Sequence, residues 1–331
     1  MNILVTLPEI DGKNSFITPE IESMLESMGN VTWNPFNRQF SADELKDYIR
    51  ETDVCITGWG CPTLDRYILE SAGRLKLVAH TGGSVATLVS PYLYDRGIRV
   101  ISGNRIFAES VAEGVLAYIL CSLRNIPYYS QDMKAGGWQT GGFMSEGLLD
   151  QDIGLVGFGM VAKYLVSMLR PFRVKIKVYD PYVNDDILRE YNVEKATLDQ
   201  IFSTCKIISI HAPKTPDTYH MINKELLEMI PDGSLFVNTA RGSIIDENAL
   251  VKELQKGRFK AVLDVYETEP LPSDSILRKL DNVILMPHMA GPTYDRRKTV
   301  TLALIEDIRN FFSGKQMVHE ISREYAMAMT R

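Results

Sequence analysis

The sequence predicts an α/β protein built from two doubly wound parallel-sheet domains. Its length of 331 residues suits two domains of ordinary size. Short apolar strand-like runs alternate with helix-like segments, a pattern that favours parallel sheets with helices on their faces. This alternation occurs twice, once in the first hundred residues and again from Ile153 onward, with a long apolar segment between the two series.

The first series begins at the N-terminus with a short β run. Thr18 and Pro19 are typical of a helix start, and Ser41 with Glu44 forms an S-x-x-E capping box that opens a second helix. Strands are expected at 2–7, 31–34, 54–58 and 75–80, and helices at 18–28, 41–50 and 65–72.

A long, mostly apolar helix is expected at 108–124. Residues 125–147 are rich in glycine and aromatic side chains and have no clear period, so we interpret them as an arm or loop that lies against a partner. The second series follows, with a Thr197-x-x-Gln200 capping box in it. Its strands are expected around 154–158, 175–180, 206–212, 234–240, 261–266 and 282–288. Its helices are expected around 160–169, 186–191, 223–230 and 246–256, with another short helix opened by the Thr197 box and a final helix around 294–313.

Composition and charge exclude several classes of protein. The net charge is −6 and the isoelectric point is about 5.5, which disfavours a nucleic-acid partner. The N-terminus lacks the basic start of a signal peptide, and we find no run of ~18 apolar residues, so no membrane partner is expected. None of the four cysteines lies in a CxxC pair, and no His/Cys cluster has zinc spacing. We therefore expect reduced thiols, no metal site and a cytoplasmic location.

A glycine-rich turn follows the first strand of the second series. Gly157 and Gly159 belong to a G-x-G-x-x-A pattern that opens a helix, where backbone N–H groups and the helix dipole favour a pyrophosphate. A plain glycine-rich βα turn would explain this pattern equally well. Asp180, which ends the next strand 21 residues after Gly159, makes a dinucleotide site the better interpretation. A carboxylate there accepts hydrogen bonds from ribose hydroxyls and repels a 2′-phosphate, so NAD is favoured over NADP.

Three reactive side chains each follow a predicted strand of the second series. They are Arg241, Glu269 and His288. In open α/β sheets, ligands bind at the carboxyl ends of strands. An imidazole can donate a proton near neutral pH, a carboxylate can orient it, and a guanidinium can hold a substrate carboxylate. Each residue alone also has a structural explanation: Arg241 could cap a surface loop, Glu269 could be a turn residue, and His288 could be a core or turn histidine.

The other histidines were compared with His288. His80 and His211 also end predicted strands; His211 is expected near the cofactor and His80 near a possible substrate loop. His220 and His319 are expected at the surface.

In its motifs and their order, the chain resembles the D-isomer-specific 2-hydroxyacid dehydrogenases. The resemblance covers about residues 75–295 well and the N-terminal region more loosely. The segments that carry it are GLVGFGMVAKYL, the strand ending in Asp180, HAPKTPDTYHMIN, VNTARGSIIDENAL, AVLDVYETEPL and MPHMAG.

The resemblance implies roles for individual residues. Arg241 would hold the substrate carboxylate, and Glu269 with His288 would form the acid/base pair, with His288 as the proton donor. The substrate loop would be Thr81–Ser84, whose Gly82, Gly83 and Ser84 present backbone N–H groups to the same carboxylate. The implied cofactor contacts are Gly157, Gly159, Met160, Val161, Asp180, His211, Ala212, Thr239, Ala240, Asp264, His288 and Gly291. Among these, Asp264 would reach the nicotinamide carboxamide.

The resemblance also implies the domain organisation. A flavodoxin-like substrate domain would comprise residues 1–103 and 294–331, and an inserted Rossmann NAD-binding domain residues 104–293. The helix at 108–124 and the arm after it resemble the family's dimer interface. We expect the chain to lack the small regulatory domain of some phosphoglycerate dehydrogenases. Ser84 and Thr87 stand where the family commonly has Gly and Asn, and Gly114 stands where a histidine is frequent; these changes bear on substrate choice.

These observations together predict an NAD-dependent oxidoreductase that interconverts a small D-2-hydroxy acid and its 2-keto acid. Glu269 argues against the formate branch of the family, where glutamine pairs with the histidine. Phosphoglycerate- and phosphite-type activities stay open. The loops after 54–58 and 75–80 offer only His80, with Arg105 nearby, and this favours an uncharged side chain on the substrate. The alternative from another class is an NAD-sensing, corepressor-like binding protein without significant turnover.

Overall fold

The computed structural model describes residues 1–9 and 13–330 and divides into two compact units. The first comprises Met1–Phe107 and Pro292–Arg331, and the second comprises Ala108–Gly291. The chain therefore passes between units at 107/108 and 291/292, whereas the boundaries predicted from the sequence lie at 103/104 and 293/294.

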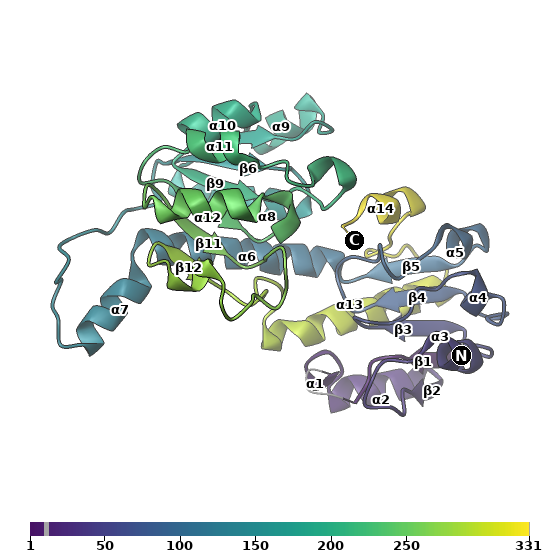
Figure 1. The fold of residues 1–331 in the computed structure, drawn as a ribbon. Coiled ribbons are helices and arrows are strands. Elements are labelled where there is room, and N and C mark those ends of the chain that lie inside the picture. Colours follow the sequence, from purple (N-terminus) through teal and green to yellow (C-terminus); the bar gives the residue numbers. More distant parts are fainter. Residues whose placement is uncertain (10–12, 331) are drawn as a thin grey trace. The chain divides into compact units, whose positions relative to one another are not determined.

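The first unit contains a five-stranded parallel sheet in the order β2-β1-β3-β4-β5 (Figure 1). This is the flavodoxin-like strand order that the resemblance implies. Its strands are β1 (Asn2–Val5), β2 (Asn30–Trp33), β3 (Val54–Thr57), β4 (Leu77–His80) and β5 (Arg99–Ser102).

Helices cover both faces of this sheet because its central strands are apolar on both sides. In β1, Leu4 packs into one buried cluster with α3, α4 and α5, whereas Ile3 and Val5 pack into another with α2 and α13. The predicted caps are present: Thr18 caps α2, and Ser41 with Glu44 forms the capping box of α3. The helices are α1 (Lys13–Phe16), α2 (Pro19–Met28), α3 (Ala42–Tyr48), α4 (Arg66–Leu69), α5 (Pro91–Asp95), α13 (Tyr294–Phe312) and α14 (Arg323–Ala328).

The second unit contains a seven-stranded parallel sheet in the order β12-β11-β10-β9-β6-β7-β8 (Figure 1). The strand order reverses at β6, where β9 lies on one side and β7 on the other, so the glycine-rich turn after β6 sits at the topological switch point. Its strands are β6 (Asp152–Val156), β7 (Lys175–Tyr179), β8 (Glu194–Lys195), β9 (Ile207–Ile210), β10 (Leu235–Asn238), β11 (Lys260–Leu263) and β12 (Val283–Leu285).

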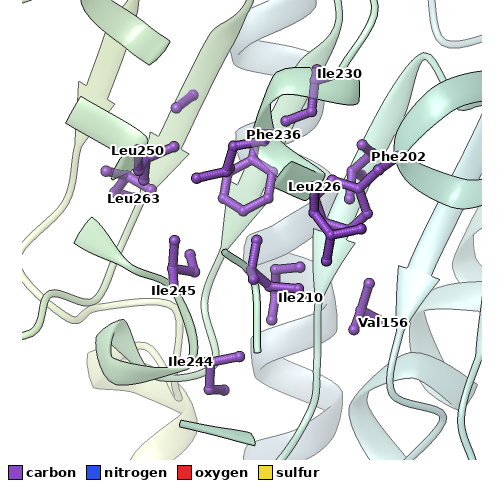
Figure 2. Close-up of a cluster of buried hydrophobic side chains, with 14 of the residues drawn as sticks. Val156, Phe202, Ile210, Leu226, Ile230, Phe236, Ile244, Ile245, Leu250 and Leu263 are labelled. Carbon is purple, nitrogen blue, oxygen red and sulfur yellow. The ribbon is translucent and has the colours of Figure 1, made fainter. Parts of the chain in front are cut away.

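Buried side chains on each face of this sheet join it to its helices. On one face, residues of β9, β10 and β11 pack with α10, α11 and α12 around Phe236 (Figure 2). On the other face, the strands pack with α6, α8 and α9. The helices are α6 (Asn104–Leu123), α7 (Ile126–Lys134), α8 (Met160–Leu169), α9 (Asp185–Tyr191), α10 (Leu198–Thr204), α11 (Lys224–Met229) and α12 (Glu247–Gln255), with single 3₁₀ turns at Arg170–Phe172, Pro216–Thr218, Gly242–Ile244 and Ile276–Lys279.

Helix α6 corrects one prediction. By length and composition, its 20 residues could cross a membrane, so the expectation that no segment reaches this length was wrong. Ala112, Val115, Ile119 and Leu123 of α6 lie in the buried cluster of the second sheet. The apolar composition of the helix therefore contributes to core packing.

Two further predictions differ from the structure. Residues 126–134, predicted as arm or loop, form α7, a helix without buried residues whose apolar side chains produce no single buried stripe. His319, predicted at the surface, is largely buried, and its Nδ1 lies 3.0 Å from Oδ2 of the buried Asp307. That carboxylate also accepts the backbone N–H groups of Val318 and His319, which ties the chain after α13 to that helix.

Candidate active site

The loop after β10 presents Arg241. Asn238, buried at the end of the strand, organises the loop: its Oδ1 accepts the Ala240 N–H at 3.0 Å and its Nδ2 donates to the Arg241 carbonyl at 3.1 Å. Ile244 and Ile245 follow and are fully buried in the cluster of Figure 2, which anchors the far end of the loop. Burial lowers the pKa of Arg241, and the negative charge of Glu269 opposes that shift, so the two side chains interact electrostatically.

The loop after β11 presents Glu269. Its Oε1 accepts the Tyr266 N–H at 3.1 Å, which closes a turn over the carboxylate. The Tyr266 hydroxyl lies 3.0 Å from the Leu263 carbonyl oxygen and 2.9 Å from that of Met286, so this ring links the ends of β11 and β12. A Cβ on Gly242 would lie 1.9 Å from the carbonyl carbon of Tyr266, and only a glycine permits this approach of the Arg241 loop.

The loop after β12 presents His288. Its Nδ1 lies 2.7 Å from Oε2 of Glu269, and its Nε2 has no hydrogen-bond partner among residues 1–9 and 13–330. The residue has a φ of 55°, in the left-handed region that a non-glycine residue seldom adopts. Asp264 fixes the backbone beyond it, because its two carboxylate oxygens accept the Met289 and Ala290 N–H groups at 2.7 and 2.9 Å.

The three predicted catalytic side chains are thus brought together from adjacent parallel strands, β10, β11 and β12, at their shared carboxyl edge. Glu269 is the link, because it is hydrogen-bonded to His288 and electrostatically coupled to Arg241. An imidazole that is oriented through Nδ1 and has a free Nε2 can exchange a proton with a ligand. The guanidinium of Arg241, which interacts electrostatically with the same Glu269, can hold a carboxylate.

The glycine-rich turn after β6 fits a dinucleotide. Gly157 has a φ of 95°, and a Cβ there would lie 2.6 Å from the Ala212 nitrogen. Gly159 is the N-cap of α8; it provides no side-chain cap, and the space where a Cβ would stand is open. The first N–H groups of α8 are therefore accessible to an anion.

Asp180 lies directly beside this turn. One carboxylate oxygen accepts the Phe158 N–H at 2.8 Å, and the other accepts the N–H groups of Tyr182 and Val183 at 2.8 and 3.0 Å. The carboxylate is thus fixed against the glycine-rich turn, in the position that the fingerprint requires for a ribose.

Two buried polar atoms near this edge have no hydrogen-bond partner among the described residues. They are His211 Nε2, just beyond β9, and Thr239 Oγ1, just beyond β10. Burial lowers the pKa of His211 to about 4, so this imidazole is neutral at pH 7. Buried polar atoms are normally paired, and a bound cofactor would supply partners here.

The predicted substrate loop lies in the first unit, after β4. The Thr81 N–H donates to the Thr57 carbonyl at 2.8 Å, whereas the N–H groups of Gly82, Gly83 and Ser84 donate to no described residue. Consecutive free N–H groups of this kind can bind an anion. Ser84 Oγ donates to the Thr330 carbonyl at 2.6 Å, so its side chain is already engaged.

Sequence reasoning missed Asn238, Gly242 and Tyr266, which position catalytic side chains without being reactive themselves. A signal existed for the first two, because a polar residue that ends an apolar strand and a glycine beside a reactive arginine both suggest backbone constraints. In the part of the chain that the structure describes, no group of three or more potential metal ligands occurs.

Comparison with known proteins identifies relatives of both units. Residues 116–290 match the model of the D-isomer-specific 2-hydroxyacid dehydrogenase NAD-binding domain. The chain is 35% identical over 270 residues to hydroxypyruvate reductase of Thermotoga maritima, covering 80% of this chain and 87% of the relative. It is 32% identical over 296 residues to D-3-phosphoglycerate dehydrogenase of Methanocaldococcus jannaschii, covering 88% of this chain and 55% of the relative. The chain thus spans about half the length of that dehydrogenase.

A solved structure agrees with these matches. A phosphoglycerate oxidoreductase from Rhizobium etli superposes with a TM-score of 0.80 and 26% identity, covering 98% of this chain and 99% of that one. The predicted fold class and the resemblance are confirmed, and the match to an NAD-binding domain confirms NAD as the cofactor.

Proposed function

Because the chain belongs to the D-isomer-specific 2-hydroxyacid dehydrogenases, we propose that it interconverts a small D-2-hydroxy acid and its 2-keto acid. The observation that supports this most directly is the Glu269–His288 hydrogen bond with the imidazole Nε2 left free, beside the guanidinium of Arg241. In this proposal the second unit is the NAD-binding domain and the first unit is the substrate domain.

NAD(H), when bound, supplies or accepts the hydride at the carbon that carries the oxygen. His288 Nε2 gives a proton to that oxygen in reduction and removes it in oxidation. Glu269 accepts a hydrogen bond from Nδ1 of the imidazole and so orients the ring, which leaves Nε2 available to the substrate. Arg241 and the N–H groups of Gly82–Ser84 are the candidate binders of the substrate carboxylate.

The groups that would hold the cofactor follow from the site. The N-terminus of α8 would meet the pyrophosphate and Asp180 the adenosine ribose. His211, Thr239 and Asp264 would contribute polar atoms at the carboxyl edge of the sheet, with Asp264 toward the nicotinamide carboxamide. The remaining predicted contacts, Met160, Val161, Ala212, Ala240 and Gly291, stay part of this proposal.

Steady-state kinetics with NADH and a panel of 2-keto acids, glyoxylate included, tests the proposal. His288→Ala should lower kcat by about 10²–10⁴-fold, the usual contribution of general acid–base catalysis. Arg241→Ala should weaken substrate binding and catalysis and leave NADH affinity nearly unchanged. Absence of turnover with every 2-keto acid, in a protein that binds NADH, would contradict the proposal and favour an NAD-sensing binding protein.

We also propose that the chain forms a homodimer through α7 and the segment after it. Trp138 and Phe143 are 78% and 80% exposed, and Ile126 and Met133 add further exposed apolar surface. A groove of about 510 Å³ lies beside them, lined by Arg124, Ile126, Tyr129, Ser130, Met133 and Ser145. Exposed apolar patches of this kind typically mark protein interfaces. Light scattering should give about twice the 37.4 kDa mass of the chain, and a monomeric mass would contradict this proposal.

A cytoplasmic location belongs to the same proposal. The four cysteines are free, as is usual in a reducing compartment. We propose neither a membrane nor a nucleic acid as a partner, because α6 contributes to the core and the net charge is −6.

A further inference from the structure

An exposed indole stands beside the glycine loop of the first unit. Trp59, in the loop after β3, is 55% exposed, and its Nε1 would lie 2.9 Å from a Cβ placed on Gly82. The backbone of Trp59 is held by Gln39, whose Nε2 donates to its carbonyl at 2.6 Å. The indole is therefore positioned against the loop whose free N–H groups are the candidate carboxylate site.

The indole is the middle member of a row of aromatic rings. Phe16 and Phe107 both pack against Trp59, with ring centroids 5.4 Å and 5.7 Å from that of the indole, and both rings are nearly perpendicular to it. Phe107 also lies 3.4 Å from the position of a Cβ on Gly83. Two of the three rings thus line the glycine loop directly, and Phe16 contacts the indole.

Two ionisable side chains, His80 and Arg297, lie close to the residues of this row. Burial lowers the pKa of His80 to about 4, so the imidazole is neutral at pH 7; its Nδ1 lies 3.0 Å from Thr57 Oγ1. The guanidinium of Arg297 stacks over Phe16 at 5.5 Å and directs N–H groups to Ser15 Oγ and the Pro292 carbonyl, both at 3.4 Å. This cation therefore already has acceptors within the protein.

We propose that Trp59 and Phe107 form a specificity-determining wall for the substrate side chain, and that this side chain is bulky and apolar or aromatic. The inference rests on the proposed function, because it takes the N–H groups of Gly82–Ser84 as the carboxylate site. In an α-keto acid the side chain begins two bonds from the carboxylate carbon. A substrate whose carboxylate is held at the glycine loop therefore places its side chain within reach of the indole. An aromatic ring gains apolar contact and edge-to-face packing there, whereas an indole and a phenyl ring give a phosphate no charge to replace its hydration.

The experiment compares kcat/KM for four substrates with NADH: glyoxylate, pyruvate, phenylpyruvate and 3-phosphohydroxypyruvate. We expect the wild-type chain to prefer phenylpyruvate to glyoxylate by about tenfold or more, in the range that apolar pockets provide. Trp59→Ala should lower kcat/KM for phenylpyruvate by about 10–200-fold. The loss with glyoxylate, which has no side chain, should be about threefold or less on the same reasoning.

Two further variants keep the result interpretable. Trp59→Phe retains an aromatic ring and should lose less phenylpyruvate activity than Trp59→Ala, so it tests the inference even if the alanine variant folds poorly. Phe312→Ala removes an exposed aromatic ring at the end of α13. It should leave the ratio of kcat/KM for phenylpyruvate to kcat/KM for glyoxylate unchanged. Thermal melting and NADH binding verify that each variant is folded.

The outcomes separate this inference from the proposed function. The inference alone is overturned if the Trp59 variants lose kcat/KM equally with phenylpyruvate and glyoxylate. It is likewise overturned if the wild type prefers 3-phosphohydroxypyruvate. In both cases 2-keto acid turnover persists, so the proposed function stands. Absence of turnover with all four substrates overturns the proposed function and the inference with it.

Discussion

Gly242→Ala is the most direct test of how the catalytic side chains are held. The change adds one methyl group between the Arg241 loop and the Glu269 loop. In the structure that methyl carbon would lie 1.9 Å from the Tyr266 carbonyl carbon, 2.2 Å from its oxygen and 2.3 Å from the Glu267 nitrogen. All three atoms belong to the backbone, so no side-chain rotation can relieve the collision.

The size of the effect follows from these distances. Ordinary contacts of a Cβ begin at 3.4 Å, so the two loops must separate by about 1.5 Å. Tyr266 donates its N–H to Glu269, and Glu269 holds His288, so the movement reaches the acid/base pair. A displacement of about 1 Å in catalytic groups can cost about 10²-fold in rate. Overpacking should also lower the free energy of unfolding by about 1–3 kcal/mol.

The assay measures kcat and KM with the best 2-keto acid of the panel, NADH affinity by fluorescence, and urea unfolding. Gly147→Ala is the matched control in the same unit, because a Cβ there meets nothing within 4 Å. We expect kcat/KM of Gly242→Ala to fall by about 10²-fold while NADH affinity changes little. A folded Gly242→Ala protein with the kcat/KM of the control would refute the argument that this contact sets the catalytic geometry.

Two other predictions concern the cofactor and pH. Asp180→Ala should narrow the preference for NADH over NADPH by about tenfold, which is the contribution of one hydrogen bond to a charged group. The Kd values of the variant and the wild type for both cofactors measure this preference. An unaltered ratio of the two Kd values would contradict a ribose contact. Burial lowers the pKa values of His80 and His211 to about 4, below the value of about 6.5 in an unfolded chain, so the unfolded state binds more protons between these values. The free energy of unfolding should therefore be highest above pH 6.5 and fall as the pH drops toward 4, by about 2 kcal/mol per histidine between pH 7.5 and pH 5. Urea titrations of the wild type, His80→Gln and His211→Gln measure this loss, and the same loss in all three proteins would speak against the buried imidazoles as its cause.

Much of the fold could be predicted because local sequence signals coincide with the tertiary structure. Thr18, the Ser41–Glu44 box and the Thr197–Gln200 box all form caps where they were expected. Most strands were equally clear, because strands buried on both faces appear as short continuous apolar runs. The strands β5 and β8 were not predicted. The helix α7 was missed because none of its residues is buried and the glycine-rich stretch that follows made the whole segment resemble a loop.

The site could be predicted in part, because reactive residue types that follow strand ends are candidates for ligand-binding and catalytic residues. Arg241, Glu269 and His288 were all predicted in this way as site residues, and the structure places Glu269 in contact with His288. The supporting contacts could not be predicted. The proximity of Gly242 to Tyr266 depends on how two loops from different strands approach each other, and neither residue shows this in its own segment. The hydrogen bond between His319 and Asp307 could not be predicted for the same reason, because Asp307 lies 12 residues away in another segment.

The supporting contacts explain how the half-exposed Glu269–His288 pair keeps a defined geometry. An isolated pair such as Glu269–His288 would contribute little to stability and would leave its geometry loosely defined. Here each partner is fixed from the backbone side: Tyr266 binds the carboxylate of Glu269, and Asp264 holds the two residues that follow His288. Both anchors come from the loop after β11, and Gly242 brings the Arg241 loop against the same segment. The direction of the imidazole is therefore determined by buried backbone contacts, while its free nitrogen stays available to a ligand.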